Sequence, residues 1–170
     1  MHVAIVHNAV PPDAPPDERD VLVQADAPPR LGLAPRGHQG VQPPATLDLS
    51  SVKERLLADR PGVVFNLVEA LNGSDRLQTL FPAMLDVIGI PYTGVPTEGF
   101  WRASHTLLAK ERLVQRGLPT PAWTVAADSP FLWTVVKGRR QGALRPPFIV
   151  KSVFEHASFG MDDASVVRTV

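Results

Sequence analysis

A continuously apolar run near the start of the chain, Val3–Val6, constrains the fold more than any other feature of the sequence. An alternating strand has one wet face, whereas a run without polar residues is typical of a parallel strand buried on both faces. The chain must therefore cover two faces of one sheet. An apolar share of 44% in 170 residues is enough for such a core.

Helical and extended patterns alternate after this run. A proline-rich loop leads to Asp17, which is predicted to cap a helix that ends at Pro28 and Pro29. Ser51 and Glu54 match a capping box, with Ser at the N-cap and Glu three residues later, at the start of a second helix. The apolar stripe of that helix is predicted to consist of Val52, Leu56 and Leu57.

The second strand of the pattern, Val63–Leu67, follows a Pro-Gly pair. A third helix that ends at Gly89 is predicted from apolar residues at helical spacing, which are Leu77, Leu80, Phe81, Met84, Leu85 and Ile88. Ile90–Tyr92 is then a short extended piece. This order of elements predicts a doubly wound α/β domain with a mostly parallel sheet and right-handed crossovers.

The pattern changes after residue 95. Residues 97–116 have the spacing of one or two helices that end at Gly117, and Leu118–Pro121 is a stiff extended linker and a predicted domain boundary. Residues 129–137 are predicted to form a helix, and 138–147 a loop. The rest is too short for a stable domain of its own kind, so the chain is predicted to end inside a domain.

Charge and composition exclude several classes of function. The chain has 17 basic and 17 acidic residues, which gives no electrostatic footprint for nucleic acid or an anionic membrane surface. There is no apolar run of about 18 residues, and the start lacks the basic and long apolar regions of a signal peptide. Without cysteine there are no disulfides and no thiolate zinc sites. These features fit a cytoplasmic protein that binds neither nucleic acid nor membrane.

A short apolar run, Phe148–Val150, is predicted to be a buried strand, and Lys151 follows it directly. The next residues form a turn that contains Glu155, Ser158 and Gly160. Such an arrangement is one way to hold polyphosphate, because the lysine supplies a point charge and the loop supplies N–H groups and a hydroxyl. The alternative is a solvated lysine at a strand end, followed by an ordinary turn.

Several motifs occur in a fixed order along residues 60–165. They are Phe65-Asn-Leu-Val-Glu69, Asn72-Gly73, Leu77-Gln78, Gly89-Ile-Pro-Tyr-Thr-Gly94, Gly117-Leu-Pro-Thr-Pro121, Ile149-Val-Lys151 and Ser158-Phe-Gly160. Their order and spacing resemble the N-terminal part of the D-alanine–D-alanine ligase branch of the ATP-grasp superfamily. The resemblance implies a Rossmann-like preATP-grasp domain at 1–95, a helical linker at 96–121, and an incomplete ATP-grasp domain of the α+β class at 122–170.

The resemblance also implies a reaction and its partners. ATP phosphorylates a small-molecule carboxylate, an amine attacks the acyl phosphate, and the products are an amide, ADP and phosphate. Mg²⁺ bridges the phosphates and neutralises the developing charge. Its acidic ligands are expected beyond residue 170, so that this chain alone is expected to be incomplete and inactive. A homodimer through the N-terminal domain is a further expectation.

Individual positions acquire roles from the same resemblance. Lys151 matches the lysine that contacts the ATP phosphates, and Ser158 matches the serine of the phosphate loop. Gly160 allows close approach of the backbone, and Glu155 matches the glutamate of that loop. Glu18 matches the glutamate that orients the amino group of the first amino-acid substrate. Glu18 and Ser158 are thus the expected catalytic residues.

The sequence departs from the family pattern near these positions. His105-Thr106 stands where the linker helix usually has Asp-Lys, and Lys110, one turn later on the same face, is the expected substitute for that lysine. Ala157 stands where the family has a serine that touches substrate, and the loop after His7 lacks the usual Gly-Gly. The substrate is therefore left open. The alternative function is a non-catalytic or degenerate domain that binds nucleotide or a partner.

Ordinary structural roles are the alternatives for several of these residues. Glu18 at a helix start stabilises the helix dipole equally well, and Lys110 suits a surface position. Glu69 follows a strand end, where α/β sheets bind ligands, but a turn role fits it as well. The tryptophans suit a core or an interface better than a platform for stacking bases, since positive charge is absent.

Overall fold

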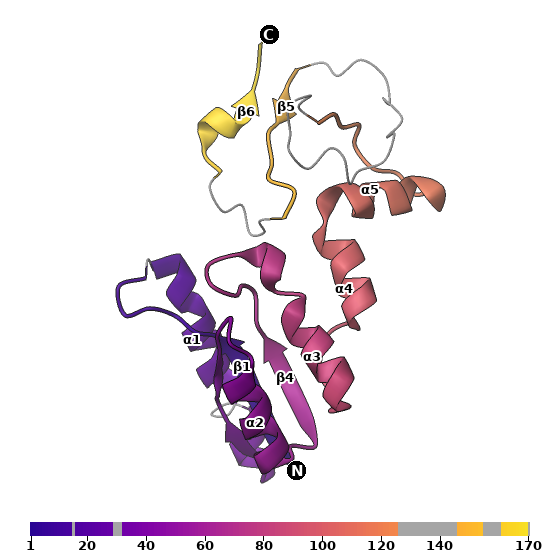
Figure 1. The fold of residues 1–170 in the computed structure, drawn as a ribbon. Coiled ribbons are helices and arrows are strands. Elements are labelled where there is room, and N and C mark those ends of the chain that lie inside the picture. Colours follow the sequence, from indigo (N-terminus) through magenta and orange to yellow (C-terminus); the bar gives the residue numbers. More distant parts are fainter. Residues whose placement is uncertain (15, 29–31, 126–145, 155–160, 170) are drawn as a thin grey trace. The chain divides into compact units, whose positions relative to one another are not determined.

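The computed structural model describes residues 1–14, 16–28, 32–125, 146–154 and 161–169 (Figure 1). The chain divides into two compact units, Met1–Phe100 and Trp101–Val170, which are called unit 1 and unit 2 below. The boundary between them falls inside helix α4, Thr97–Ser104. The predicted division at 1–95, 96–121 and 122–170 stays a prediction.

Unit 1 is built around β1, His2–Asn8, which pairs in parallel with three other strands (Figure 1). One edge of β1 pairs with β4, Val63–Leu67. The opposite edge pairs first with β2, Gln39–Val41, and further along with β3, Pro44–Ala45. β3 and β4 lie on opposite edges, because His7 pairs with both of them. The predicted parallel α/β sheet is thereby confirmed.

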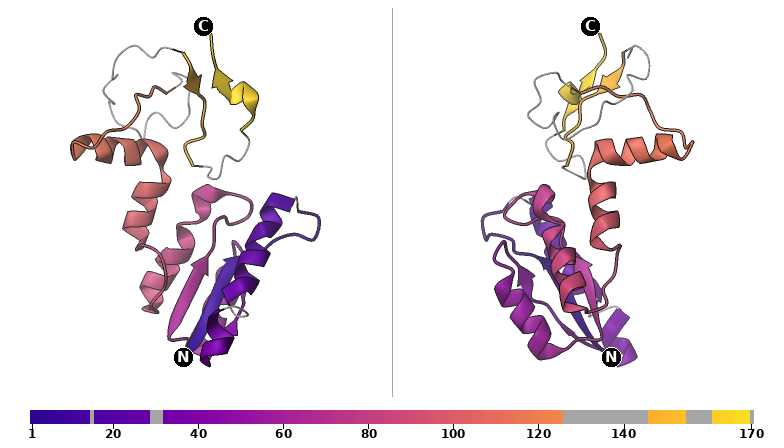
Figure 2. Two further views of the ribbon diagram at one scale, coloured as in Figure 1. Left: turned by 180° about the vertical axis from the view of Figure 1, so that it is seen from behind. Right: turned by 45° about the vertical axis from the view of Figure 1, so that its right-hand side comes forward.

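Three helices flank this sheet, and they are α1 (Pro16–Pro28), α2 (Ser50–Asp59) and α3 (Leu80–Ile88) (Figure 2). Successive residues of a strand face opposite sides. Ala4 and Val6 of β1 accordingly share a core with residues of α2 and α3. Val3 and Ile5 share a second core with Ala25 of α1. Helices on both faces explain why the run Val3–Val6 contains no polar residue.

α1 starts two residues earlier than an N-cap at Asp17 predicts. The helix begins at Pro16, so that Asp17 lies in its first turn and not at the N-cap position. Proline suits the first helical position, because its N–H would be unpaired there and its fixed φ is already helical. The predicted end at Pro28 is confirmed.

The predicted capping box of α2 is also wrong. The helix begins at Ser50, and the side chain that accepts from this end is Asp48, whose Oδ1 accepts the Ser50 N–H at 3.0 Å and the Ser50 hydroxyl at 2.6 Å. Ser51 is therefore the second residue of the helix and Glu54 the fifth, so neither has the position that a capping box requires. The apolar stripe is narrower than predicted, because Val52 and Leu56 are buried whereas Leu57 is 47% exposed.

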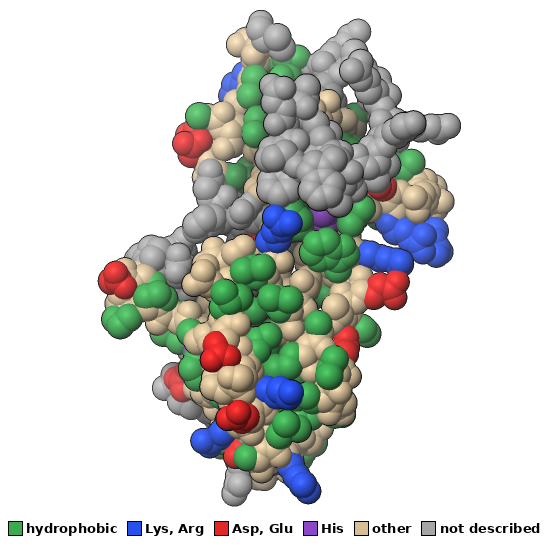
Figure 3. Space-filling view, in the orientation of Figure 1, with side chains coloured by type: hydrophobic (Ala, Val, Ile, Leu, Met, Phe, Trp, Pro, Cys, Tyr) green, Lys and Arg blue, Asp and Glu red, His purple; other side chains and the backbone are tan. Residues whose placement is uncertain are grey.

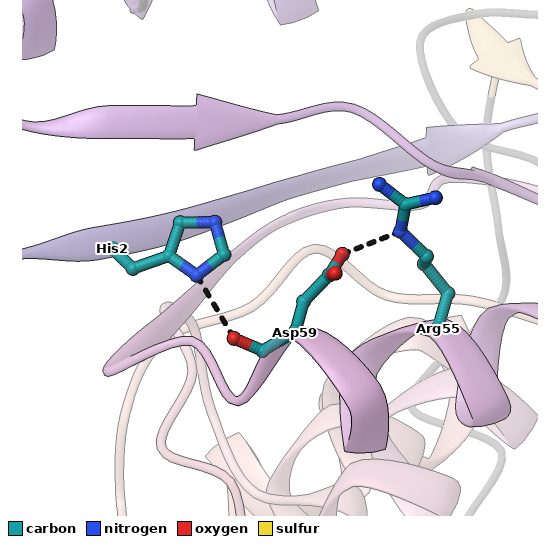
Figure 4. A network of polar contacts seen from close by, with 3 residues as sticks. All are labelled: His2, Arg55 and Asp59. Atoms are coloured by element: carbon teal, nitrogen blue, oxygen red, sulfur yellow. Dashed lines mark hydrogen bonds and ion pairs between the residues drawn. The ribbon is translucent and has the colours of Figure 1, made fainter.

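The start of β1 is tied to the end of α2 (Figure 4). The Nδ1–H of His2 donates to the carbonyl of Asp59 at 3.0 Å. The carboxylate of Asp59 pairs with the guanidinium of Arg55, one turn earlier on the helix. Arg60 ends the helix in the left-handed region, with φ 45° and ψ 58°.

The third predicted helix is confirmed in its main part. α3 buries Phe81 and Leu85, and it ends at Gly89, whose φ of 71° is the left-handed value that glycine adopts without strain. The predicted helix is divided, because a short 3-10 helix, Asp75–Leu77, precedes α3. Leu80 is 43% exposed and adds little to the core.

Asp86 joins α3 to the start of α4. Its carboxylate accepts from the hydroxyls of Tyr92 and Thr97, both at 2.6 Å, and from the Thr97 N–H at 3.2 Å. These bonds, from Thr97 first and then from Tyr92, hold the pKa of Asp86 below its usual value. The pKa of Tyr92 is raised to about 12, chiefly by burial and secondly by the hydrogen bond to Asp86.

Unit 2 begins with the last part of α4 and continues with α5, Thr106–Gln115, so the two-helix form of the prediction for 97–116 is confirmed. Its strands β5, Phe148–Ile149, and β6, Val166–Val167, pair antiparallel. The predicted strand at Phe148–Val150 is confirmed for Phe148–Ile149, but its predicted burial is wrong, because Ile149 is 50% exposed and Val150 60%. Two short strands alone cannot cover both faces of their sheet.

Three further features complete the description. The predicted helix at 129–137 and most of the loop at 138–147 lie outside the described residues. Within the described ranges, no helix has both the length and the apolar character that crossing a membrane requires. On the face of unit 1 drawn in Figure 3, acidic and basic side chains are interspersed and do not gather by sign.

Candidate functional site

Lys151 is the second residue after β5, and its side chain is exposed. The preceding residue, Val150, donates its N–H to the carbonyl of Ser165 at 2.8 Å. This bond fixes the backbone just after β5. Ser165 itself is bonded to Asp162, which caps the short 3-10 helix before β6. No hydrogen bond or ion pair engages the ammonium group of Lys151 within the described residues.

The segment that follows Lys151 is hydrogen-bonded to the first turn of α5. The Thr106 N–H donates to the carbonyl of Val153 at 3.0 Å. His105, the N-cap of α5, accepts the Leu108 N–H at its Nδ1 at 3.3 Å and is only 5% exposed. The proton of a neutral imidazole that accepts at Nδ1 is on Nε2. Two of the N–H groups that a helix start leaves without partners are thus satisfied here.

Aromatic side chains gather at the same place. The ring of Phe154 meets the ring of His105 edge-on, with centroids 4.8 Å apart and planes at 74°. Trp101 completes the group, 6.0 Å from Phe154 and 6.3 Å from His105. Phe154 was not singled out in the sequence, since nothing local marks an aromatic residue in a turn as a partner of a helix cap.

Lys110 is engaged by the extended linker after α5. Its Nζ donates to Thr120 Oγ1 at 3.1 Å and to the carbonyl of Pro121 at 2.8 Å, and it lies 5.1 Å from the centroid of the Trp123 ring. Partial burial lowers the pKa of Lys110. An ammonium group has three donors, and these two hydrogen bonds use two of them. The residue therefore fixes Leu118–Pro121 against α5, and its third donor has no acceptor among the residues that the structure describes.

The remaining candidate residues are not placed by the structure. Glu155, Ser158 and Gly160 lie outside the described residues, as does Ala157. Glu18 lies in the first turn of α1, for which the structure describes the backbone alone. The structure thus describes the surroundings of Lys151 and those of Lys110, which both lie in unit 2, and it leaves the catalytic residues expected from the sequence untested.

The carboxyl end of the parallel sheet in unit 1 carries polar side chains that hold its loops. Asn8 Oδ1 accepts the Glu69 N–H at 3.4 Å, and Asn66 Oδ1 accepts the Val68 N–H at 3.0 Å. The N–H of Asn66 in turn donates to Thr93 Oγ1 at 3.0 Å. This is the edge where open α/β sheets bind ligands. The sequence analysis did not identify this cluster, although asparagines near the ends of two predicted strands could have indicated it.

Two buried polar atoms have no hydrogen-bond partner within the described part of the chain. They are Nε2 of Gln78, a residue that is 4% exposed, and Oε1 of Glu111. Burial raises the pKa of Glu111, because the charged form loses hydration. No group of three or more histidine, aspartate or glutamate side chains gathers into a metal-binding arrangement among the described residues.

Known proteins are similar to most of this chain. The D-alanine–D-alanine ligase of Moorella thermoacetica is 34% identical over 116 residues, which are 66% of this chain and 35% of that protein. The D-alanine–D-alanine ligase of Sphingopyxis alaskensis is 31% identical over 147 residues, which are 85% of this chain and 42% of that protein. No protein-family model matches the chain.

A solved structure supports the fold independently of close sequence identity. The D-alanine–D-alanine ligase of Bacillus anthracis superimposes with a TM-score of 0.54 at 17% identity, covering 73% of this chain and 38% of that one. At this identity the likeness shows the mixed α/β fold alone. This chain spans less than half the length of each of these three proteins.

Proposed function

The chain is D-alanine–D-alanine ligase-like and corresponds to the N-terminal part of such proteins, and from this relationship we propose that it is part of an ATP-dependent carboxylate–amine ligase. The observation that carries the proposal is the match to three proteins named D-alanine–D-alanine ligase, over 66% to 85% of this chain. The parallel α/β fold of unit 1 supports the same assignment.

The proposed reaction forms an amide bond in two steps. A substrate carboxylate attacks the terminal phosphorus of ATP, which gives an acyl phosphate and ADP. An amine then attacks the acyl carbon, the acyl–oxygen bond breaks, inorganic phosphate leaves, and the amine loses a proton. Mg²⁺ supplies charge neutralisation at the phosphates. The substrates are proposed to be amino acids or similar small molecules, without a commitment to D-alanine.

The residues proposed for the phosphates are cations and a small polar loop. Lys151 fits this role, because its exposed ammonium group follows a fixed strand end and is not engaged by another described residue. The third donor of Lys110 suits an acceptor such as a phosphate oxygen. Glu155, Ser158 and Gly160 are proposed as the rest of the phosphate loop, and Glu18 as the group that orients a substrate amine.

The domain organisation proposed with this function has three parts. Residues 1–95 form the preATP-grasp domain, 96–121 the helical linker, and 122–170 the start of an ATP-grasp domain. The two compact units, Met1–Phe100 and Trp101–Val170, support a change of domain between the parallel sheet and the segment with Lys151.

The direct experiment measures phosphate release by the full-length protein with Mg²⁺, ATP and pairs of amino acids. We expect release that depends on both a carboxylate and an amine. Nucleotide binding without release for any pair would instead favour the second candidate function, a degenerate nucleotide-binding domain. That alternative is supported by Thr106, which stands at the position of the usual lysine and uses its backbone N–H for Val153.

The role of Lys151 has its own test. Lys151→Ala should weaken ATP binding by about 10- to 150-fold, because a charge-assisted contact contributes roughly 1.5–3 kcal/mol. Lys53→Ala is the matched control, since Lys53 is an exposed lysine on α2 in unit 1. Unchanged ATP affinity in Lys151→Ala would remove this residue from the site.

A further inference from the structure

The segment that carries Lys151 is attached to the start of α5 by a backbone bond and a side-chain contact. The Thr106 N–H donates to the carbonyl of Val153 at 3.0 Å. One residue further, the ring of Phe154 packs edge-on against His105, with centroids 4.8 Å apart. Both contacts involve residues of unit 2, and both follow Lys151 within three positions.

Two of the interactions of His105 bear on this attachment. Its Nδ1 accepts the Leu108 N–H and so caps the helix, while its ring forms one wall of the contact with Phe154. A short polar residue such as asparagine caps a helix equally well. Capping alone therefore gives no reason for an imidazole that is 5% exposed, whereas the contact between the rings does.

The covalent chain limits how far Lys151 can move while this contact persists. Three residues span at most about 11 Å when fully extended. The Cα of Lys151 thus stays within that distance of the Cα of Phe154. At the other end, the Val150 N–H is bonded to Ser165. Lys151 is consequently held on both sides, by the strand exit and by the start of α5.

We propose that Trp101, His105 and Phe154 form an aromatic clasp that positions Lys151 for the phosphates of a nucleotide. This inference rests on the proposed function and deepens it. The three aromatic residues are positioning residues, because they act through the segment that carries the lysine. His105 is the central member, since it contacts Phe154, lies near Trp101, and also caps the helix to which the segment is bonded.

The experiment compares ring-removing and ring-keeping variants of the full-length protein. His105→Asn keeps a capping side chain and removes the ring, and Phe154→Leu keeps an apolar side chain and removes the ring. We expect each to weaken ATP binding by about 3- to 10-fold, which is the range for the loss of one aromatic pair. The double variant should bind about as weakly as either single variant, because both remove the same contact. Phe154→Tyr should bind like the wild type.

Hydrogen exchange of the peptide that contains Thr106 provides a second readout, independent of ATP. Exchange at the Thr106 amide should be faster in His105→Asn and in Phe154→Leu, and unchanged in Phe154→Tyr and in Lys151→Ala. If Phe154→Leu and Phe154→Tyr bind ATP equally well, or if exchange at Thr106 does not change, the clasp is overturned. If Lys151→Ala binds ATP normally, the proposed phosphate contact fails instead, whatever the exchange at Thr106 shows.

Discussion

Arg60 has a left-handed backbone conformation, which is unfavourable for any residue with a Cβ. It ends α2 with φ 45° and ψ 58°, and a left-handed residue other than glycine costs roughly 1–2 kcal/mol. Arg60→Gly should therefore raise the free energy of unfolding by up to about 1 kcal/mol, because glycine removes the strain but loses more chain entropy on folding. Urea unfolding of the chain measures this change.

Arg116 is the matched control for this substitution. It also ends a helix, α5, but with φ −96° and ψ 7°, a conformation that any residue adopts. Arg116→Gly should lower stability by roughly 0.5–1 kcal/mol, because the entropic disadvantage of glycine is then not offset. A loss of stability in Arg60→Gly would contradict the strain at that position.

Asp86 and Tyr92 make stability depend on pH at both ends of the scale. The folded pKa of Asp86 is below its unfolded value, so its contribution is present above about pH 3.9 and is lost as the pH falls through the folded pKa. The folded pKa of Tyr92 is raised to about 12, so its contribution is present below about pH 10 and is lost as the pH rises toward 12. Asp86→Asn should flatten the acid limb of the stability profile.

The chain contains one tyrosine, which makes this prediction directly measurable. Absorbance of the phenolate should follow a single ionisation with a midpoint of about 12 in the folded chain. Asp86→Asn should lower the midpoint only in part, since burial is the larger cause and the bond to Asp86 the second. A midpoint near 10, the value of an unperturbed tyrosine, would show that the phenol is not held as described.

Leu56 and Leu57 were both predicted to lie on the apolar face of α2, but the orientation of the helix buries only Leu56. Leu56 is fully buried in the core of unit 1, whereas Leu57 is 47% exposed. Leu56→Ala should cost about 2–5 kcal/mol in the free energy of unfolding, because it leaves a cavity. Leu57→Ala should change it by no more than about 0.5 kcal/mol. Equal effects in denaturant unfolding would mean that the helix is rotated.

Elements with strong patterns could be predicted from the sequence, and those defined by distant partners could not. β1, β4 and α3 follow from apolar runs, helical spacing and the stop at Gly89. β2 and β3 contain two or three residues each and include glycine and proline, which disfavour strands. They are strands only because β1 offers them an edge, and no local signal contains that information.

Capping signals were less informative than apolar spacing. Ser51 and Glu54 have the right residue types for a capping box, yet Asp48 accepts from the helix start instead. One cap contributes only about 1 kcal/mol, so packing of Val52 and Leu56 can shift the start of the helix by a residue or two. The same reasoning applies to Asp17 and α1.

The site could be predicted in part, at the level of the lysine and its neighbours in sequence. Lys151 is exposed after a strand, as the motif indicates, and Lys110 proved to be bonded to the linker that follows its own helix. The contact of Phe154 with His105 was missed, because the two residues lie in motifs that are far apart in the sequence. Only the folded unit 2 places the two rings together.

At the scale of the whole molecule, ATP should stabilise the full-length protein against unfolding. A ligand at 100 times its Kd contributes about 2.7 kcal/mol. With the same ATP concentration, the 10- to 150-fold range of weaker binding proposed for Lys151→Ala leaves only about 0.3–1.4 kcal/mol. Thermal unfolding with and without ATP measures the difference, and an equal shift in wild type and variant would contradict the assignment of Lys151.

The position of β1 also determines when unit 1 can form during protein synthesis. β1 precedes β2, β3 and β4 in the chain, so both of its edges stay unpaired until the ribosome has made those strands. The sheet closes only when residues up to Leu67 have left the exit tunnel. Until then the apolar segment β1 is exposed on the nascent chain and prone to aggregation, so early binding of a chaperone to it would be advantageous.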